Sequence, residues 1–242
     1  MTAGPERSEG IVGDSEVVPG LAAFGIRAFT TTRVSGSFGL MSDEPVSAVM
    51  GRWSALRREL RPGGSRLASA SQVHGARVLQ HRGVWDGWLR ADEADGHFSE
   101  GRGTALAVTV ADCVPVFIAH QSGMIALLHS GWRGTSARIV EHGIAAMMAC
   151  GAPTEELYLH CGPAICGKCY EVSAEVYGQL TGRNAQKPTT VDLRELIADH
   201  ARAKGVRHIT CSASCTRCDN DRFFSHRAGD AGRQLGVMIA DL

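Results

Sequence analysis

Three short segments of the chain each place a metal-binding side chain after a run of apolar residues, in a turn bounded by Gly or Pro. The three side chains are those of His74, Cys113 and His129. Zinc binds imidazole nitrogen and thiolate sulfur in tetrahedral geometry, and a catalytic zinc typically takes three protein ligands and leaves the fourth position open. The intervals of 39 and 16 residues between these side chains favour a site assembled from neighbouring strands over a zinc-finger loop.

The same three residues have two other interpretations. Cys113 can pack as a small hydrophobic residue while both histidines hydrogen-bond to the backbone. Alternatively, Cys113 is a nucleophile and one of the histidines is its general base. Because the chain contains ten His and eight Cys, spacing alone does not separate these interpretations.

A second set of thiols lies in two Cys-x-x-Cys pairs, Cys166 with Cys169 and Cys215 with Cys218, which begin 49 residues apart. Such pairs are typical of a structural zinc site. The interval is longer than in ordinary zinc ribbons, and three further cysteines offer competing thiols: Cys150, Cys161 and Cys211. The alternative is a set of reduced thiols in loops that border the active site.

The composition is that of a globular protein with a small ligand. Of 242 residues, 44% are hydrophobic, and 25 Lys plus Arg balance 25 Asp plus Glu. A net charge of zero argues against a nucleic acid or an anionic membrane as the partner. The longest apolar run, 104–119, is interrupted by Asp112 and Pro115 and is too short to span a bilayer. The cysteines are too few for a disulfide scaffold, so we expect reduced thiols and a cytoplasmic location.

Hydrophobic periodicity and turn residues predict a flexible tail over residues 1–19 and a single mixed α/β domain over residues 20–242. Helices are expected at Val46–Leu60, Thr135–Cys150, Ala174–Leu180 and Asp192–Ala203. Strands are expected at Ile26–Thr32, Leu67–Val73, Val78–Gln80, Ala105–Val110, Val116–Ala119, Met124–Leu128, Leu157–His160, Val206–Cys211 and Val237–Ala240. The alternation of strands and helices is too irregular for a doubly wound sheet.

Several motifs follow one another along the chain: Thr30–Arg33, Gln72–Gly75, Ala111–Pro115, His129–Gly134, Gly162–Ile165, Tyr170–Val172, Cys215–Thr216, Phe223–Ser225 and Gly232–Arg233. Together, over roughly residues 24–241, they resemble the laccase-domain family of the YfiH type. This family was once labelled multicopper polyphenol oxidoreductases. Its members are now regarded mainly as purine nucleoside phosphorylases with adenosine deaminase activity.

The resemblance implies an α/β (α+β) fold of four layers, in which helices flank a central β-sandwich similar to the catalytic domain of cytotoxic necrotizing factor toxins. It also implies that His74, Cys113 and His129 bind zinc. Copper-dependent polyphenol oxidation, as by a laccase, is not favoured, because multicopper oxidases need many more histidines than one His-Cys-His set supplies. Polyphenol oxidation is then at most a side activity of protein in which copper has replaced zinc.

The implied reaction is the displacement of a purine base from ribose by phosphate, with adenosine, inosine, guanosine and methylthioadenosine as candidate nucleosides. Phosphate is bound best by the planar fork of arginine, and the candidates are Arg33, Arg233 and Arg133. Deamination needs a hydroxide, which zinc supplies by lowering the pKa of bound water to near 7. We expect a monomer or a weak homodimer.

Two further residues of the motifs have open roles. Asp112 is either the general acid or base, or the partner that orients a ligating histidine. Gln72 either hydrogen-bonds the base or ribose, or fixes its own turn. Together with the trio of His74, Cys113 and His129, Asp112 completes the expected catalytic set.

The sequence departs from the family pattern at two places that affect the substrate site. The loop Val34–Leu40 is shortened, and the usual Tyr-Arg-Arg after Phe-Phe-Ser is replaced by His226, Arg227 and Ala228. Two other functions therefore stay open. One is a cysteine hydrolase that edits peptidoglycan precursors, as suggested for bacterial proteins that resemble this chain. The other is a non-enzymatic accessory protein of cell division.

Overall fold

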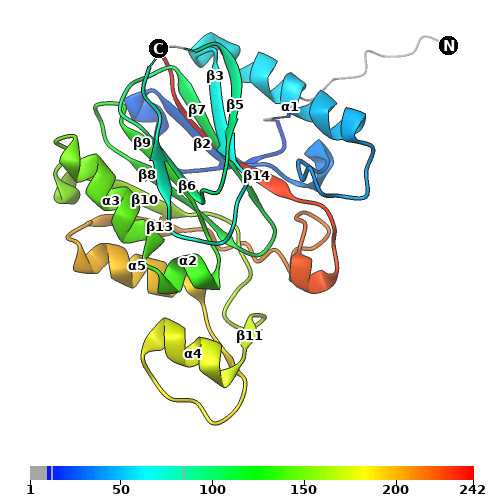
Figure 1. Cartoon of the computed structure of the whole chain (residues 1–242), viewed down its shortest axis with the longest axis vertical. Coiled ribbons are helices and arrows are strands. Elements are labelled where there is room, and N and C mark those ends of the chain that lie inside the picture. The colour runs from blue at the N-terminus through cyan, green and yellow to red at the C-terminus, as the bar shows by residue number, and fades with distance from the viewer. Residues whose placement is uncertain (1–9, 12, 84) are drawn as a thin grey trace.

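A computed structural model describes residues 10–11, 13–83 and 85–242, which form two six-stranded β-sheets with helices on their outer faces (Figure 1). The first sheet has the strand order β1 (Glu16–Val17), β2 (Ile26–Thr30), β14 (Gln234–Ala240), β7 (Thr104–Val110), β3 (Arg66–Ala70) and β5 (Gly87–Ala91). The second has the order β13 (His208–Cys211), β10 (Tyr158–Cys161), β8 (Val114–Ala119), β9 (Ile125–Ser130), β6 (Gly96–Ser99) and β4 (Val78–Gln80). A separate short pair consists of β11 (Glu171–Val172) and β12 (Thr189–Thr190).

Both large sheets contain parallel and antiparallel strands. In the first sheet β3 pairs in parallel with β5 and β7, whereas β14 pairs antiparallel with β2 and β7. In the second sheet the outermost pairs, β10 with β13 and β4 with β6, are parallel. The strands between them are antiparallel. The predicted mixed α/β class is confirmed, and the absence of regular βα alternation has its reason in these mixed pairings.

Three apolar cores hold the layers together. Between the two sheets, Leu106, Phe117, Leu127 and Met238 are buried against one another. On the outer face of the first sheet, α1 (Val46–Leu60) packs Val49, Trp53 and Leu56 onto residues such as Ala105 and Val237. On the outer face of the second sheet, α3 (Ile139–Ala149) and α5 (Leu193–Ala203) pack Ile144, Met147 and Ile197 onto Val116 and Leu128. The two groups of helices lie on opposite sides of the sheets (Figure 1).

Helix prediction was accurate except at one position. The bounds of α1 agree with the sequence pattern, and α4 (Ala174–Thr181) and α5 agree within one residue. The helix expected over Thr135–Cys150 is wrong at its start. It is divided into α2 (Trp132–Ser136) and α3, because Arg138 adopts a left-handed conformation with φ of 60°. None of the described helices has the length and apolarity that crossing a membrane requires.

Several strands and the start of the packed region differ from expectation. β5, β6, β11 and β12 were missed, although all four residues of β6 are buried. Of the segment 1–19 that is expected to be a flexible tail, residues 1–9 and 12 lie outside the described residues. Glu16–Val17 nevertheless pair with β2, and Val18 is buried, so the packed part of the chain begins before residue 20.

The turn between β7 and β8 carries the chain from the first sheet to the second. β7 ends at Val110, and β8 begins at Val114 and pairs with the end of β9, with Pro115 opposite His129. The segment after β3 reaches the same region, because Gln72 hydrogen-bonds to Thr109 in β7. The ends of β3, β7 and β9 therefore deliver the three predicted metal-binding side chains to one place.

Candidate active site

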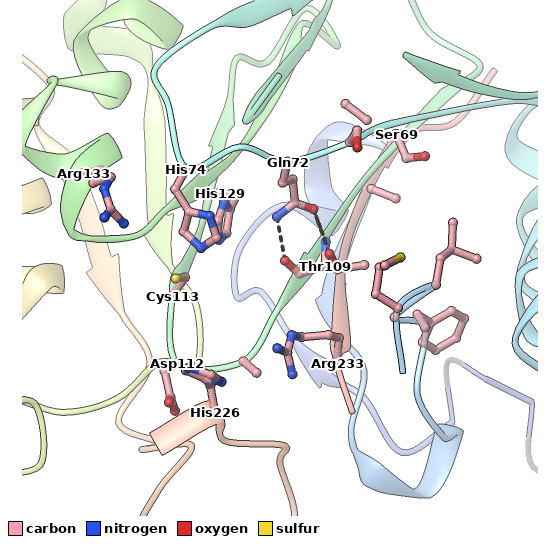
Figure 2. Close-up of a pocket in the computed structure, with 18 of the residues that line it drawn as sticks. Ser69, Gln72, His74, Thr109, Asp112, Cys113, His129, Arg133, His226 and Arg233 are labelled. Carbon is pink, nitrogen blue, oxygen red and sulfur yellow. Dashed lines mark hydrogen bonds between the residues drawn. The ribbon is translucent and has the colours of Figure 1, made fainter. Parts of the chain in front are cut away.

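A cavity of about 580 Å³ lies at this junction of the two sheets. His74, Cys113 and His129 all line it, and their ligand atoms lie within 4.8 Å of one another. Figure 2 shows the two imidazole rings side by side above the sulfur of Cys113. The ring centroids are 4.8 Å apart and the rings are close to perpendicular. The structure therefore brings together the trio that the sequence singles out.

The turn that carries His74 is held by a carboxylate that sequence analysis missed. Asp95 is fully buried. Its Oδ1 accepts the backbone N–H of His74 at 2.9 Å, and its Oδ2 accepts those of Val73 and Gly75 at 3.2 and 2.7 Å. His74 has φ of 60°, a conformation that persists only where its surroundings hold it. Asp95 supplies that restraint.

The same carboxylate fixes the second histidine. Oδ1 of Asp95 accepts the Nδ1 proton of His129 at 2.8 Å, which leaves Nε2 of His129 for Cys113 or for a metal. A carboxylate that orients a ligating histidine in this way is the usual outer partner of a protein zinc site. From the sequence, Asp112 is a candidate for this role as one of two alternatives. Sequence analysis missed Asp95 because the strand after Asp95, β6, was not detected.

The charges at the trio depend on close contact between thiol and imidazole. Burial alone would raise the pKa of the Cys113 thiol, but the positive charge of His129 and hydrogen bonds from His129 and His74 lower it to about 6. Burial would lower the pKa of His129, whereas the Cys113 thiolate and Asp95 raise it to about 9. The metal-free pair is therefore a thiolate and an imidazolium at neutral pH.

Asp112 lines the cavity but does not contact either histidine. Its Oδ1 accepts a hydrogen bond from the Thr216 hydroxyl, and its Oδ2 accepts one from the backbone N–H of Arg227, both at 2.6 Å. The side chain points away from the imidazoles of the trio (Figure 2). Both carboxylate oxygens are therefore engaged in holding the 216–227 segment.

The side chain of Gln72 bonds to a neighbouring strand and not within its own turn. Its side-chain oxygen accepts the backbone N–H and the hydroxyl of Thr109, each at 2.8 Å, and its amide nitrogen donates to the backbone oxygen of Thr109. Figure 2 shows two of these contacts. Gln72 thus joins the His74 segment to β7 while one face of its side chain lines the cavity.

The three candidate phosphate-binding arginines fall into two groups. Arg133 and Arg233 line the cavity, and they approach it from α2 and from the segment before β14 (Figure 2). Arg33 is not part of the lining. Its guanidinium pairs with Asp230 at 2.5 Å, donates to the backbone oxygen of Asn220 and lies over the ring of Phe224. These contacts use Arg33 to hold the loop that carries Asn220 and Asp230.

The lining also includes four ionisable side chains to which sequence analysis assigned no role: Arg90, Tyr170, His226 and Arg227. The guanidinium of Arg227 lies over the Tyr170 ring, 5.1 Å from its centroid. Burial, followed by the negative charge of Cys113, raises the pKa of Tyr170 to about 12, so Tyr170 is a neutral hydrogen-bond donor at neutral pH. His226 and Arg227 lie in the segment that departs from the family pattern, and this departure was the only available signal.

The two Cys-x-x-Cys pairs also come together. The sulfur atoms of Cys166, Cys169, Cys215 and Cys218 lie within 4.8 Å of one another. This four-cysteine cluster and the His74–Cys113–His129 trio are the two groups in the described part of the chain that could hold a metal ion.

Comparison with known proteins gives a consistent result. The family model described as multi-copper polyphenol oxidoreductase laccase matches residues 30–241. Purine nucleoside phosphorylase ORF3 of Streptomyces griseus is 31% identical over 211 residues, which cover 84% of this chain and 85% of the relative. Purine nucleoside phosphorylase Rv2149c of Mycobacterium tuberculosis is 32% identical over 234 residues, which cover 88% and 91% of the two chains.

Solved structures share the fold. The crystal structure of YlmD from Geobacillus stearothermophilus superposes with a TM-score of 0.83 at 26% identity and covers 98% of both chains. The Neisseria meningitidis protein NMB0706 superposes with the same TM-score at 24% identity and covers 95% of this chain and 100% of that chain. The chain therefore belongs to the multi-copper polyphenol oxidoreductase laccase family, which includes the YlmD and YfiH proteins.

Proposed function

We propose that the chain is a zinc-dependent purine nucleoside phosphorylase that acts on adenosine, inosine, guanosine and methylthioadenosine, with adenosine deaminase as a second activity. The observation that carries the proposal is a single cavity lined by the His74–Cys113–His129 trio and by Arg133 and Arg233. A volume of about 580 Å³ lies within the usual range for sites of small organic ligands. The relatives named purine nucleoside phosphorylase, which cover most of the chain, support the same activity.

The donor set fits zinc. Two imidazoles and one thiolate are borderline-soft ligands, and three protein ligands leave one position for a reactant. Asp95 orients His129 in the manner expected around a zinc ion. When bound, zinc supplies a Lewis acid that can polarise a purine substituent or lower the pKa of water for deamination. Copper also accepts this donor set, but one histidine-containing group does not provide the several copper centres of a laccase.

The arginines are assigned to phosphate. In phosphorolysis a phosphate oxygen forms a bond to the anomeric carbon of ribose while the bond to the purine nitrogen breaks, and the base leaves with the electron pair. Arg133 and Arg233 hold the monoanionic or dianionic phosphate, because a guanidinium donates two parallel hydrogen bonds to a phosphate. Tyr170 and His226 line the same cavity and can donate a hydrogen bond to the departing base.

The remaining details of the proposal are physical expectations. Eight free cysteines suit a cytoplasmic protein, whose compartment keeps thiols reduced. We expect the protein to work as a monomer or weak homodimer, with a nucleoside and phosphate as its only small-molecule partners. The likeness to the toxin catalytic domain is a further prediction, supported by the layered packing of helices on two central sheets.

The test is a panel of nucleosides assayed with and without phosphate on protein of known zinc content. We expect phosphate-dependent release of hypoxanthine from inosine and of adenine from adenosine, and loss of both in Cys113→Ala. Release of base that does not depend on phosphate would overturn the assignment to phosphorolysis. Retention of full activity in Cys113→Ala would overturn the role of the trio.

One observation favours a second candidate, a cysteine hydrolase acting on an amide such as a peptidoglycan precursor. Cys113, His129 and Asp95 form a continuous line of thiolate, imidazolium and carboxylate, which is the arrangement of a cysteine nucleophile with its base and orienting acid. Rapid alkylation of Cys113 that zinc does not slow would favour the hydrolase. Protection by stoichiometric zinc would favour the metal site.

A further inference from the structure

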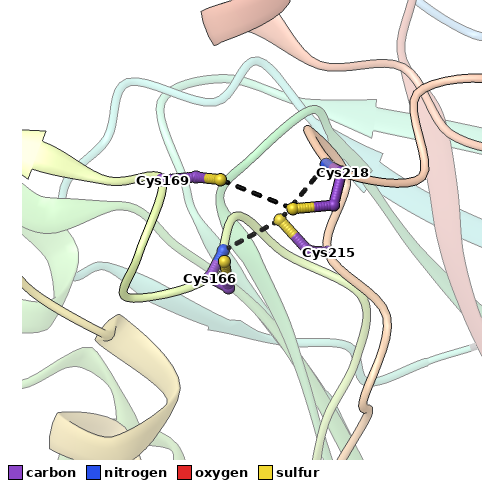
Figure 3. Close-up of side chains that lie close together, drawn as sticks. All are labelled: Cys166, Cys169, Cys215 and Cys218. Carbon is purple, nitrogen blue, oxygen red and sulfur yellow. Dashed lines mark hydrogen bonds between the residues drawn. The ribbon is translucent and has the colours of Figure 1, made fainter.

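The four-cysteine cluster joins two loops that are far apart in the sequence. Cys166 and Cys169 lie in the loop after β10, and Cys215 and Cys218 lie in the loop after β13. A parallel bridge between Ala164 and Cys215 brings the loops together. All four sulfur atoms point toward a common centre (Figure 3).

The spacing of the sulfur atoms matches a tetrahedral metal site. At a zinc–sulfur distance of about 2.3 Å, four sulfurs at the corners of a tetrahedron lie about 3.8 Å apart. In the cluster the Cys169 and Cys218 sulfurs are 3.5 Å apart, and no pair exceeds 4.8 Å. All eight cysteines of the chain are free thiols, and a disulfide would require a separation of about 2.0 Å.

The backbone around the cluster is arranged to stabilise negative sulfur. The sulfur of Cys215 accepts the backbone N–H groups of Cys166 at 3.2 Å and of Cys218 at 3.5 Å. The Cys215 loop is itself closed by Asp219, whose carboxylate accepts the N–H of Cys215. The Cys166 loop is closed by hydrogen bonds from the N–H groups of Cys169 and Tyr170 to the oxygen of Cys166. Hydrogen bonds within the chain therefore hold both loops around the four sulfur atoms.

We propose that Cys166, Cys169, Cys215 and Cys218 bind one zinc ion in a closed structural site that clamps two loops of the active-site wall. Four thiolates fill every position of a tetrahedral zinc ion, so this site holds structure and does no chemistry. It is separate from the His74–Cys113–His129 trio and does not depend on the proposed phosphorylase activity.

The clamp acts close to the cavity. Tyr170, the residue after Cys169, lines the cavity. Thr216, the residue after Cys215, donates to Asp112, which also accepts the backbone N–H of Arg227. Release of the metal would loosen both loops, and through them the wall formed by Tyr170 and Arg227.

The first experiment counts zinc per chain in protein purified without chelators. We expect Cys113→Ala to keep the zinc of the four-cysteine cluster and Cys166→Ser/Cys169→Ser to lose it. The matched control is Cys211→Ser, which changes an exposed cysteine outside both groups and should keep the wild-type zinc content. Equal zinc in the wild type and in the double variant would overturn the proposal.

The second experiment remains decisive if the double variant does not fold. Cobalt(II) is added to Cys113→Ala after removal of zinc, and the thiolate-to-cobalt charge-transfer absorption is measured. Because this variant lacks the thiol of the trio, we expect an intense band from four thiolates at one equivalent of cobalt. A spectrum without that band, or a Cys169–Cys218 disulfide in the purified wild type, would overturn the site.

The third experiment tests the clamp by hydrogen–deuterium exchange of Cys113→Ala with and without zinc. We expect zinc to slow exchange in residues 164–172 and 214–227 at least tenfold and to leave α1 unchanged. Equal exchange in both states would contradict the clamping role, whatever the zinc content.

Discussion

Replacement of Asp95 by Asn should weaken metal binding at the trio although Asp95 itself is not a ligand. The Asp95 carboxylate accepts four N–H groups, three from the backbone of residues 73–75 and one from His129. An asparagine has one side-chain oxygen with two lone pairs, so at least two of these donors lose their partner. The new amide also presents N–H groups to other N–H groups.

The expected magnitude follows from these lost contacts. Removal of the partner that orients a ligating histidine lowers metal affinity about 10- to 100-fold, which corresponds to about 1.4 to 2.7 kcal/mol of binding free energy. Two lost hydrogen bonds to a buried carboxylate should also lower the free energy of unfolding by about 3 kcal/mol or more. We would measure the zinc dissociation constant by chelator competition and check by circular dichroism that the variant is folded.

The matched control is Asp112→Asn, the carboxylate next to Cys113 in the sequence. Its two partners are a hydroxyl and one backbone N–H. An asparagine can satisfy both, because the Thr216 hydroxyl can accept from the amide while the amide oxygen accepts from Arg227. Zinc affinity should therefore change less than about twofold, well below the effect of a lost orienting partner. Equal losses in the two variants, or no loss in Asp95→Asn, would refute the reasoning.

Three further predictions follow from the charges of the structure. In metal-free protein, the rate of Cys113 alkylation by iodoacetamide should increase with pH around a midpoint near 6, because His129 and His74 lower the pKa of the thiol to about 6 although burial raises it. One equivalent of zinc should suppress the alkylation. A midpoint above 8 would contradict the thiolate–imidazolium pair. Arg133→Ala should raise the KM for phosphate about 10-fold or more, as expected for a lost charge-assisted hydrogen bond. Arg33→Ala should leave that KM unchanged and lower the urea concentration at which the protein unfolds, because Arg33 pairs with Asp230 outside the cavity. A raised KM in Arg33→Ala with an unchanged KM in Arg133→Ala would exchange their roles. Burial, and then the charge of His81, lower the pKa of His97 to about 3. As pH falls from 6.5 to 5 the unfolded state therefore binds this proton first, and this group alone should lower the free energy of unfolding by about 2 kcal/mol. Burial also lowers the pKa of His160 to about 4, so in urea titrations His97→Phe should reduce the pH dependence by about that amount and leave the rest; an unchanged pH dependence would exclude His97 as a source.

The elements of the fold could be predicted from the sequence where a segment has one apolar face. Only one face of helix α1 is buried, and the spacing of Val49, Trp53 and Leu56 therefore predicts where the helix lies. The central strands β7 and β14 are buried on both faces, so they give continuous apolar runs without alternation. Such runs indicate that a segment is a strand, but they do not indicate which strands pair with it. The break at Arg138 was invisible because apolar periodicity continues through it.

The sequence predicted the three side chains of the trio but not the residues that hold them in place. His74, Cys113 and His129 are chemically distinctive, and the structure places them together. Asp95 acts through hydrogen bonds from N–H groups, which leave no pattern in a sequence. Arg33 belongs to a motif, yet its partner Asp230 is 197 residues away. No local feature shows that this guanidinium is already engaged.

The central claim is that this cavity transfers a ribosyl group from a purine to phosphate. The most direct measurement is the product formed from inosine and isotopically labelled phosphate by zinc-quantified protein. The account predicts labelled ribose 1-phosphate in amounts equal to the hypoxanthine released, and none with Cys113→Ala. Free ribose in place of ribose 1-phosphate, or no cleavage of inosine or adenosine by the zinc-loaded protein, would contradict it.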